Sequence, residues 1–307
     1  MLEKIVLLAF GFFSFIAFVL YGVDKHRAIN HKWRIPEATL LLISSVGGVG
    51  ALLGMIVFRH KTRKLKFRIL VPLFMIIDLL IAGFFWWTAD YYYPGVATIE
   101  AIQSDDDVKV ENYKSYYLFN GPSDDRTLIF YPGAKVDEKA YAPLLHEIAA
   151  TTMDVYLVKM PFRLAFLGFN SAGTIVENSF YNEYYIGGHS LGGAVASYYA
   201  AKHEVSFKGL FLLAAYPVKQ TTLDTLLIYG SEDKILNMDH VNSAKDMVTG
   251  RFEEFVIKGG NHAQFGDYNL QDGDGEAKIS PEEQREVTIE RFSDFFPPTS
   301  EDDNKKK

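Results

Sequence analysis

The chain has 307 residues, of which 49% are apolar and 15% aromatic, and a formal net charge of −7. Because only 22% of the residues are charged, the composition excludes a disordered chain, which combines low hydrophobicity with high charge. The absence of cysteine excludes a disulfide framework and any zinc site with thiolate ligands.

The charge divides the chain into two parts. Residues 1–88 carry 11 Lys and Arg against 4 Asp and Glu, a net charge of +7, whereas the other 219 residues carry 20 basic and 34 acidic residues, a net charge of −14. A change of this size predicts two modules in two environments. The acidic second module also argues against nucleic-acid binding.

Three long apolar runs fill the first module. They are Ile5–Val23, Ala38–Phe58 and Ile69–Thr88, of 19, 21 and 20 residues. A helix needs about 20 residues to cross the hydrocarbon core, so residues 1–88 are predicted to form a membrane domain with about three transmembrane segments. Asp78 is the one charge inside the third run, and it either has a function there or pairs with a hydroxyl or basic side chain.

The loops between the runs predict the orientation of this domain. Residues 24–37 carry four Lys and Arg, and residues 59–68 carry six. Basic loops favour the cytoplasmic side, so the middle run either spans, with Gly50 and Gly54 on a packing face, or forms a re-entrant hairpin. Both alternatives place residues 89–307 outside the cytoplasm. We therefore expect a multi-pass plasma-membrane protein whose partner is the lipid bilayer.

Four short motifs in this module match a known pattern. They read D-K-x-x-A at 24–28, R-I-P-E at 34–37, G-G-x-G-A at 47–51 and R-H-K-T at 59–62. Through them residues 15–85 resemble a family of small bacterial integral membrane proteins of unknown function. The resemblance implies no activity.

The second module, residues 107–296, alternates short β-rich runs with helical patterns. Strands are predicted at 127–131, 155–159, 184–188, 210–215 and 226–230, and helices at 141–148, 192–202, 239–248 and 281–295. This alternation predicts an α/β fold, a mostly parallel sheet with helices on both faces. Residues 89–106 are expected to form a linker, and residues 297–307 a disordered charged tail.

One motif points to a reactive serine. Residues 188–192 read G-H-S-L-G and follow the apolar run 184–187 directly. This is the G-x-S-x-G pattern of a nucleophile elbow, a sharp strand-to-helix turn in which only glycine at the flanking positions permits the close approach. Ser190 is therefore the predicted nucleophile, and the alternative is an ordinary glycine-rich turn.

A nucleophilic serine needs a base, and the base needs an acid that orients it. Asp233 follows the predicted strand 226–230, and His262 follows the apolar run 255–257. Both lie where open α/β sheets place their sites, and the chain order is serine, acid, histidine. Taken singly, a turn aspartate and a loop histidine are the alternatives.

Acyl transfer also needs two N–H donors for the developing oxyanion. One is predicted to be the amide of Leu191, the residue after the nucleophile. We assign the other to Ala134, because residues 131–134 follow an early strand; the alternative for Pro132 and Gly133 is a plain turn.

These motifs, with F-Y-P-G at 130–133, G-S-E-D at 230–233 and G-G-N-H-A at 259–263, make residues 107–296 resemble the α/β-hydrolase family, in a compact dienelactone-hydrolase-like branch. The resemblance implies Ser190 as nucleophile, His262 as base and Asp233 as the acid that orients it. A dienelactone hydrolase proper uses cysteine, which this chain lacks, so its substrate is not implied.

The sequence therefore predicts a membrane-anchored serine hydrolase of the esterase or lipase type that cleaves an ester or other acyl bond of a small or lipid-like substrate. No metal and no cofactor are expected; the acidic run 272–276 lacks the glycine that a calcium loop needs at its sixth position. Two alternatives are a non-catalytic binding module on a hydrolase scaffold, and a membrane transport or assembly protein with an accessory outer domain.

Overall fold

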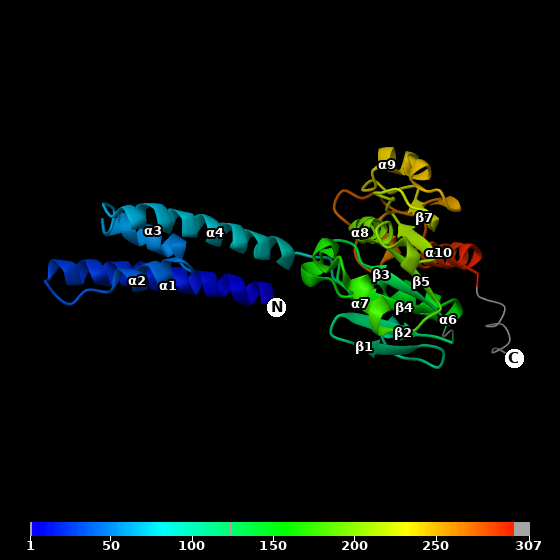
Figure 1. Cartoon of the computed structure of the whole chain (residues 1–307), viewed down its shortest axis with the longest axis horizontal. Helices are drawn as coiled ribbons and strands as arrows, with labels where there is room; N and C mark the ends of the chain where they lie inside the picture. Colours follow the sequence, from blue (N-terminus) through cyan, green and yellow to red (C-terminus); the bar gives the residue numbers. More distant parts are fainter. Residues whose placement is uncertain (1, 123–124, 298–307) are drawn as a thin grey trace. The chain divides into compact units, whose positions relative to one another are not determined.

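A computed structural model of the chain describes residues 2–122 and 125–297. Of the expected charged tail, 297–307, only residue 297 is among the described residues. The chain divides into two compact units, Met1–Asp90 and Tyr91–Lys307. Figure 1 shows the first as a group of helices and the second as a sheet covered by helices.

The first unit is all-α. Its helices are α1 (Leu2–Ile29), α2 (Glu37–Ser44), α3 (Gly48–Val57) and α4 (Leu65–Ala89). Of these, α1 and α4 are long and apolar enough to cross a membrane. The middle apolar run is broken between α2 and α3, so the described residues contain two helices of spanning length where about three segments were expected.

Glycines and an aspartate explain the break. A Cβ atom on Gly47 would lie 2.5 Å from the Phe13 carbonyl oxygen, and one on Gly50 would lie 1.7 Å from the Ser14 carbonyl oxygen. Glycine is therefore required where α3 begins against α1. The Gly48 amide, at the start of α3, donates a 2.7 Å hydrogen bond to Asp78 Oδ2. The partner of Asp78 is thus a backbone amide, which differs from the hydroxyl or basic side chain considered above.

The second unit contains one eight-stranded sheet with the order β1-β2-β4-β3-β5-β6-β7-β8. Strands β1 and β2 pair antiparallel, as do β2 and β4, and the remaining neighbours are parallel. The strands are β1 (Lys109–Asn112), β2 (Tyr116–Asn120), β3 (Arg126–Tyr131), β4 (Asp154–Val158), β5 (Glu183–His189), β6 (Gly209–Leu213), β7 (Asp224–Gly230) and β8 (Phe252–Ile257).

Helices cover both faces of this sheet. Successive side chains of a strand point to opposite sides, and here the side chains on both sides are apolar and buried. Leu128 and Phe130 of β3 pack in one core with α6 and α10, whereas Ile129 and Tyr131 pack in a second core with α7, α8 and α9. The predicted fold class is confirmed. The helices are α6 (Ala142–Thr151), α7 (Ser171–Asn178), α8 (Leu191–Ala200), α9 (Met238–Asn242) and α10 (Pro281–Phe295).

Residues 91–106, most of the expected linker, belong to the second unit. Tyr92 forms a bridge with Val136, and the short helix α5 (Ala97–Ala101) follows. The Thr98 amide and hydroxyl both donate to Asp267 Oδ2, at 2.7 and 2.9 Å. These bonds fasten the segment to the loop that follows His262.

Candidate active site

Ser190 lies between the end of β5 and the start of α8, in a strained conformation with φ 52° and ψ −125°. A non-glycine residue at positive φ is disfavoured and persists only where the surroundings fix it. Here the Ser190 amide donates a 2.9 Å hydrogen bond to the Leu213 carbonyl of the neighbouring strand β6. The turn therefore holds the serine at the carboxyl edge of the sheet.

The two flanking glycines make this turn possible. A Cβ atom on Gly192 would lie 2.2 Å from the Tyr131 carbonyl oxygen and 2.3 Å from that of Pro132. One on Gly188 would lie 2.5 Å from the same Tyr131 oxygen. Both positions adjoin backbone that cannot move aside like a flexible side chain, so the start of α8 can reach β3 only because these residues are glycine.

His262 and Asp233 form a buried pair. The Nδ1 atom of His262 lies 2.8 Å from Asp233 Oδ2, and the two side chains are 1% and 0% exposed. The other carboxylate oxygen accepts the amides of Ile235 and Leu236, at 2.9 and 2.8 Å. These bonds fix the orientation of the carboxylate. Among the described residues, Nε2 of His262 is buried and has no hydrogen-bond partner.

Two side chains that the sequence reasoning did not select hold the His262 loop. Gln284 of α10 accepts the Asn261 amide at 3.0 Å and donates to the Asn261 carbonyl at 2.9 Å. Asp274 accepts the Ala263 amide at 3.0 Å and the Lys234 amide at 3.3 Å, and so joins the loop after β8 to the loop after β7. Asp274 comes from the acidic run compared above with a calcium loop, and its role here is structural.

A directed chain of hydrogen bonds runs behind the site. The Gly133 amide donates to the Tyr141 hydroxyl at 3.1 Å, Tyr141 lies 2.8 Å from His189 Nδ1, and His189 Nε2 lies 3.1 Å from the His262 carbonyl. Because a carbonyl can only accept, His189 must be protonated at Nε2, which leaves Nδ1 to accept the Tyr141 proton. Burial, with the ring of His262 nearby, lowers the pKa of His189 well below its ordinary value. His189 is thus a neutral link between two loops of the site.

A pocket of about 240 Å³ opens at the serine. Ser190, Leu191 and His262 line it, and Ala134 is not among its lining residues. The Leu191 amide is the first of α8 and has no intrahelical acceptor, so it is available to a ligand. The remaining lining residues are Ala194, Ala214, Ala215, Tyr216, Ile235, Leu236 and Asn237.

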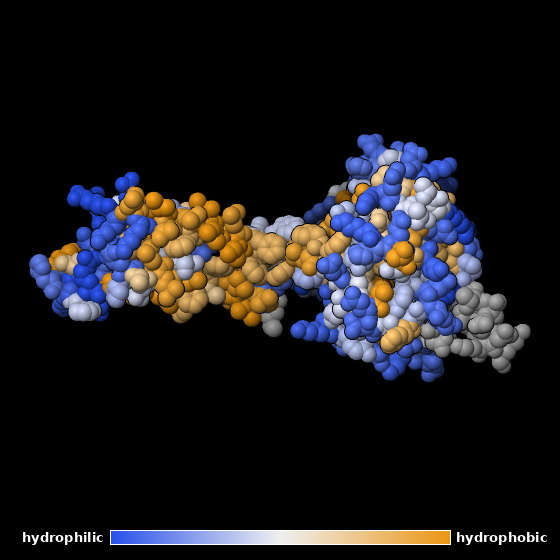
Figure 2. Space-filling model, viewed as in Figure 1, coloured by the Kyte–Doolittle hydropathy of each residue, from blue (hydrophilic) through white to orange (hydrophobic). Residues whose placement is uncertain are grey.

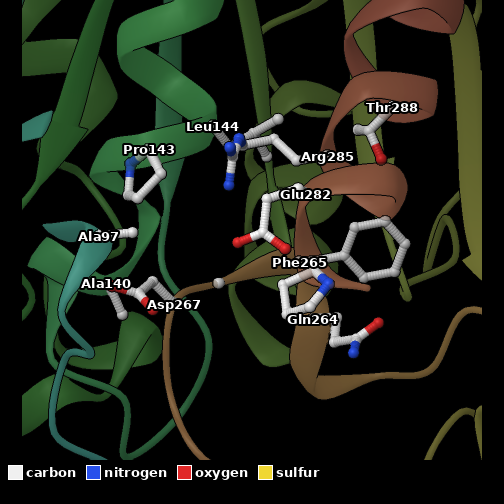
Figure 3. Close-up of a pocket in the computed structure, with 12 residues that line it drawn as sticks. Ala97, Ala140, Pro143, Leu144, Gln264, Phe265, Asp267, Glu282, Arg285 and Thr288 are labelled. Atoms are coloured by element: carbon white, nitrogen blue, oxygen red, sulfur yellow. The ribbon is translucent and has the colours of Figure 1, made fainter. Parts of the chain in front are cut away.

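A second cavity lies behind the His262 loop (Figure 3). Gln264 and Phe265 line it together with Glu282 and Arg285 of α10. Its volume is about 60 Å³, which holds water but not a substrate. The pocket at Ser190 is therefore the candidate active site. Within the described part of the chain no three His, Asp or Glu side chains are grouped to hold a metal ion.

Residues 127–286, just over half of the chain, match the family described as the alpha/beta hydrolase family. The chain belongs to this family. The N-terminal residues 14–67 match a family described as a protein of unknown function, DUF1294, and that domain is present here. The uncharacterized protein YsdA of Bacillus subtilis is 43% identical over 70 residues, which are 22% of this chain and 79% of YsdA. The resemblances to the α/β-hydrolase family and to a family of unknown function are confirmed.

Solved structures similar to this chain are hydrolases with low sequence identity. A predicted CIB-like hydrolase from Thermoplasma acidophilum is 15% identical, with a TM-score of 0.42 and coverage of 61% of this chain and 98% of that one. Dienelactone hydrolase from Anabaena variabilis is 12% identical, with a TM-score of 0.45 and coverage of 62% and 99%. A thermophilic esterase from Thermogutta terrifontis is also 12% identical, with a TM-score of 0.45 and coverage of 64% and 95%.

Proposed function

We propose that the chain is a serine hydrolase that cleaves an ester or other acyl bond through an acyl-enzyme. The observation that carries this proposal is the strained Ser190 in a pocket that also contains His262, whose Nδ1 is bonded to a buried Asp233. Family membership supports a hydrolase, and the geometry supports the residue roles.

The proposed reaction has two steps. Ser190 Oγ attacks the acyl carbonyl as Nε2 of His262 takes its proton, and this proton then passes to the leaving alcohol or amine. A water molecule, activated by the same Nε2, releases the acid and restores Ser190. Asp233 holds Nδ1–H of His262 and stabilises the imidazolium that forms.

Two amides are proposed to bind the oxyanion of each tetrahedral intermediate. The Leu191 amide adjoins the nucleophile at the start of α8, and the Ala134 amide belongs to the loop after β3. Gly133, the neighbour of Ala134, is held by Tyr141 and through it by His189. This chain of bonds would keep the loop in place while charge develops on the substrate.

The pocket walls suggest the acyl group. Ala194, Ala214 and Ala215 are small, and Ile235 and Leu236 are apolar. An apolar pocket of about 240 Å³ favours a short, uncharged acyl chain. The leaving group would then face the open side of the pocket.

We further propose that α1 and α4 anchor the hydrolase in the plasma membrane. In the most apolar window of each helix only 11% of the residues are buried within the structure, which is unlike a core helix of a soluble domain. The two basic loops lie at one end of the unit, since Asp24 bonds to Arg34 of one loop and His60 of the other. With this end in the cytoplasm, the hydrolase domain after α4 lies outside.

Labelling of intact cells with a membrane-impermeant fluorophosphonate tests both proposals. We expect wild type to be labelled and Ser190→Ala not to be, with Ser243→Ala as the control because Ser243 is exposed and does not line the pocket at Ser190. Ser190-dependent labelling that appears only after lysis would keep the enzyme and overturn the orientation. Absence of labelling in lysed wild type would favour a non-catalytic binding module.

A further inference from the structure

A groove of about 580 Å³ lies at the basic end of the N-terminal unit. It runs along α1 past the end of the apolar run, and the polarity of its lining changes along its length. One part is apolar and the other carries basic side chains. The apolar part is lined by Phe18, Val19, Gly22, Val23 and Phe58, and the basic part by His26, Arg27 and Lys32.

The apolar floor is built from α1 and from Phe58, the residue that follows α3. The rings of Phe18 and Phe58 pack with centroids 5.0 Å apart. A Cβ atom on Gly22 would lie 2.9 Å from the Phe58 ring, so glycine lets this ring pack closely against the helix. Val19 remains 41% exposed beside this pair and offers an unpaired apolar surface.

The acids at this end are already neutralised. Asp24 and Glu37 are the only acidic residues between positions 24 and 68. Asp24 accepts Arg34 at 2.9 Å and His60 at 2.7 Å, while Glu37 pairs with Lys61 at 2.9 Å, with Lys64 at 3.0 Å and with Lys66. The carboxylates therefore leave no negative charge for the groove.

Six cations in the same segment have no carboxylate partner among the described residues. They are Lys25, Arg27, Lys32, Arg59, Arg63 and Arg68. Two of them, Arg27 and Lys32, stand at the groove and are exposed. Figure 2 shows the corresponding change from an orange apolar band to a blue end on this unit. Trp33, next to Lys32, is 87% exposed, as is typical of a side chain at a membrane interface.

We propose that this groove binds one anionic phospholipid. The phosphate lies between Arg27 and Lys32, and an acyl chain follows Val19 and the Phe18–Phe58 pair. A soluble anion would use the two cations but not the apolar floor. A zwitterionic lipid such as phosphatidylcholine brings its own cationic headgroup, which offsets the charge of its phosphate beside Arg27 and Lys32. The inference rests on the proposed membrane insertion of this unit, because only there does such a lipid meet the groove at the right depth.

Native mass spectrometry of the delipidated full-length protein in detergent tests this assignment. The probes are phosphatidylglycerol and phosphatidylcholine with the same acyl chains. The test variant is Arg27→Gln with Lys32→Gln, and the matched control is Arg63→Gln with Arg68→Gln, which removes the same charge from the same end away from the groove. We expect wild type to bind one phosphatidylglycerol in preference to phosphatidylcholine. The test variant should bind it about 30-fold more weakly, and the control within about threefold of wild type.

Equal weakening in the two double variants would overturn the site, because it would indicate diffuse attraction to a basic surface. Equal binding of the two lipids by wild type would also overturn it. Failure of membrane insertion is measured separately, by extraction of cell membranes with alkaline carbonate. Protein released by carbonate contradicts the membrane proposal itself, whereas inserted protein without lipid preference contradicts the groove alone. Fluorophosphonate labelling should be the same in all these variants.

Discussion

The two units distribute large apolar side chains in opposite ways (Figure 2). In the second unit large apolar side chains fill two cores on either side of the sheet, whereas in the first many lie on the outside, as Leu8, Phe15 and Leu80 do at 75%, 68% and 70% exposure. Both units also bury charged side chains, among them Asp24 and Asp78 in the first and Arg126 and Asp154 in the second. The exposed apolar side chains of the first unit support the proposed membrane insertion, because lipid rather than water would then surround them.

Buried carboxylates also serve different purposes in the two units. One oxygen of Asp24, Oδ2, pairs with His60, Arg34 and Lys61 together. Its negative charge therefore offsets the positive charge of the two basic loops. Among the described residues Asp233 bonds to a single side chain, the ring of His262, and its other oxygen accepts only backbone amides. An orienting acid needs this arrangement, because its negative charge must be kept for one imidazole.

The largest expected effect is on catalysis, when Asp233 loses its negative charge. Asp233→Asn should lower kcat for ester hydrolysis by about 10⁴-fold, or about 5.4 kcal/mol in the barrier, since an amide no longer fixes the tautomer of His262. The measurement is steady-state hydrolysis of a short-chain p-nitrophenyl ester. Asp239→Asn, at an exposed aspartate of α9, is the control and should retain wild-type kcat. A loss of less than tenfold in Asp233→Asn would remove this residue from the proposed triad.

A second prediction concerns the packing of α3 against α1, which should affect the stability of the first unit but not hydrolysis in the second. Gly50→Ala places a Cβ atom 1.7 Å from the Ser14 carbonyl and should destabilise the N-terminal unit by about 1–3 kcal/mol or more. Gly11→Ala is the matched control, because its Cβ atom meets nothing within 4 Å and alanine favours a helix by about 0.5–1 kcal/mol.

Tryptophan fluorescence during thermal unfolding in detergent measures this effect, because Trp33, Trp86 and Trp87 all lie in the first unit. We expect a lower midpoint for Gly50→Ala, an unchanged or higher one for Gly11→Ala, and wild-type esterase activity in both at low temperature. Equal midpoints in the two variants would contradict the close approach of α3 to α1.

Sequence patterns predicted the features that short segments encode. The strands β3 to β7 are apolar runs ended by glycine or a polar turn, and each was placed within two residues of its bounds. Of β8, only the last three residues, 255–257, were noted as an apolar run. The antiparallel pair β1 and β2 was not separately assigned, because β1 is short, polar and half exposed and gives no alternation to read. In the first unit the glycines of the middle run were visible, but two arrangements fitted them equally, and the bond from Gly48 to Asp78 spans 30 residues.

The same limit applies to the site. The serine motif is local, so its glycines could be read directly, whereas the roles of Asp274 and Gln284 depend on loops brought together by the fold. His189 stands at a variable position of the motif, and its partners Tyr141 and His262 are 48 and 73 residues away. No sequence pattern identifies a histidine that links two loops. Its burial and hydrogen bonds in the structure, however, predict that His189 is neutral.

The smallest expected effect follows from His189, which is neutral and 1% exposed in the folded protein. Its folded pKa is lowered, foremost by burial, whereas the unfolded chain has the ordinary value of about 6.5. Below that pH only the unfolded state takes up the proton, so the stability contribution is present above about pH 6.5 and is lost as the pH falls. Between pH 7.5 and 5.5 this residue should lower the free energy of unfolding by at most about 1.4 kcal/mol.

His189→Gln should reduce this pH dependence, and His203→Gln, at an exposed ring, should keep it. Urea unfolding followed by the near-ultraviolet circular dichroism of tyrosine isolates the second unit, which holds 17 of the 18 tyrosines. His189→Gln is also expected to be less stable than wild type at pH 7.5, since the bond to Tyr141 or to the His262 carbonyl is weakened. If wild type and His189→Gln lose the same free energy on acidification, His189 is not the neutral link that joins the loops of the site, and the pH response of this unit must come from other groups.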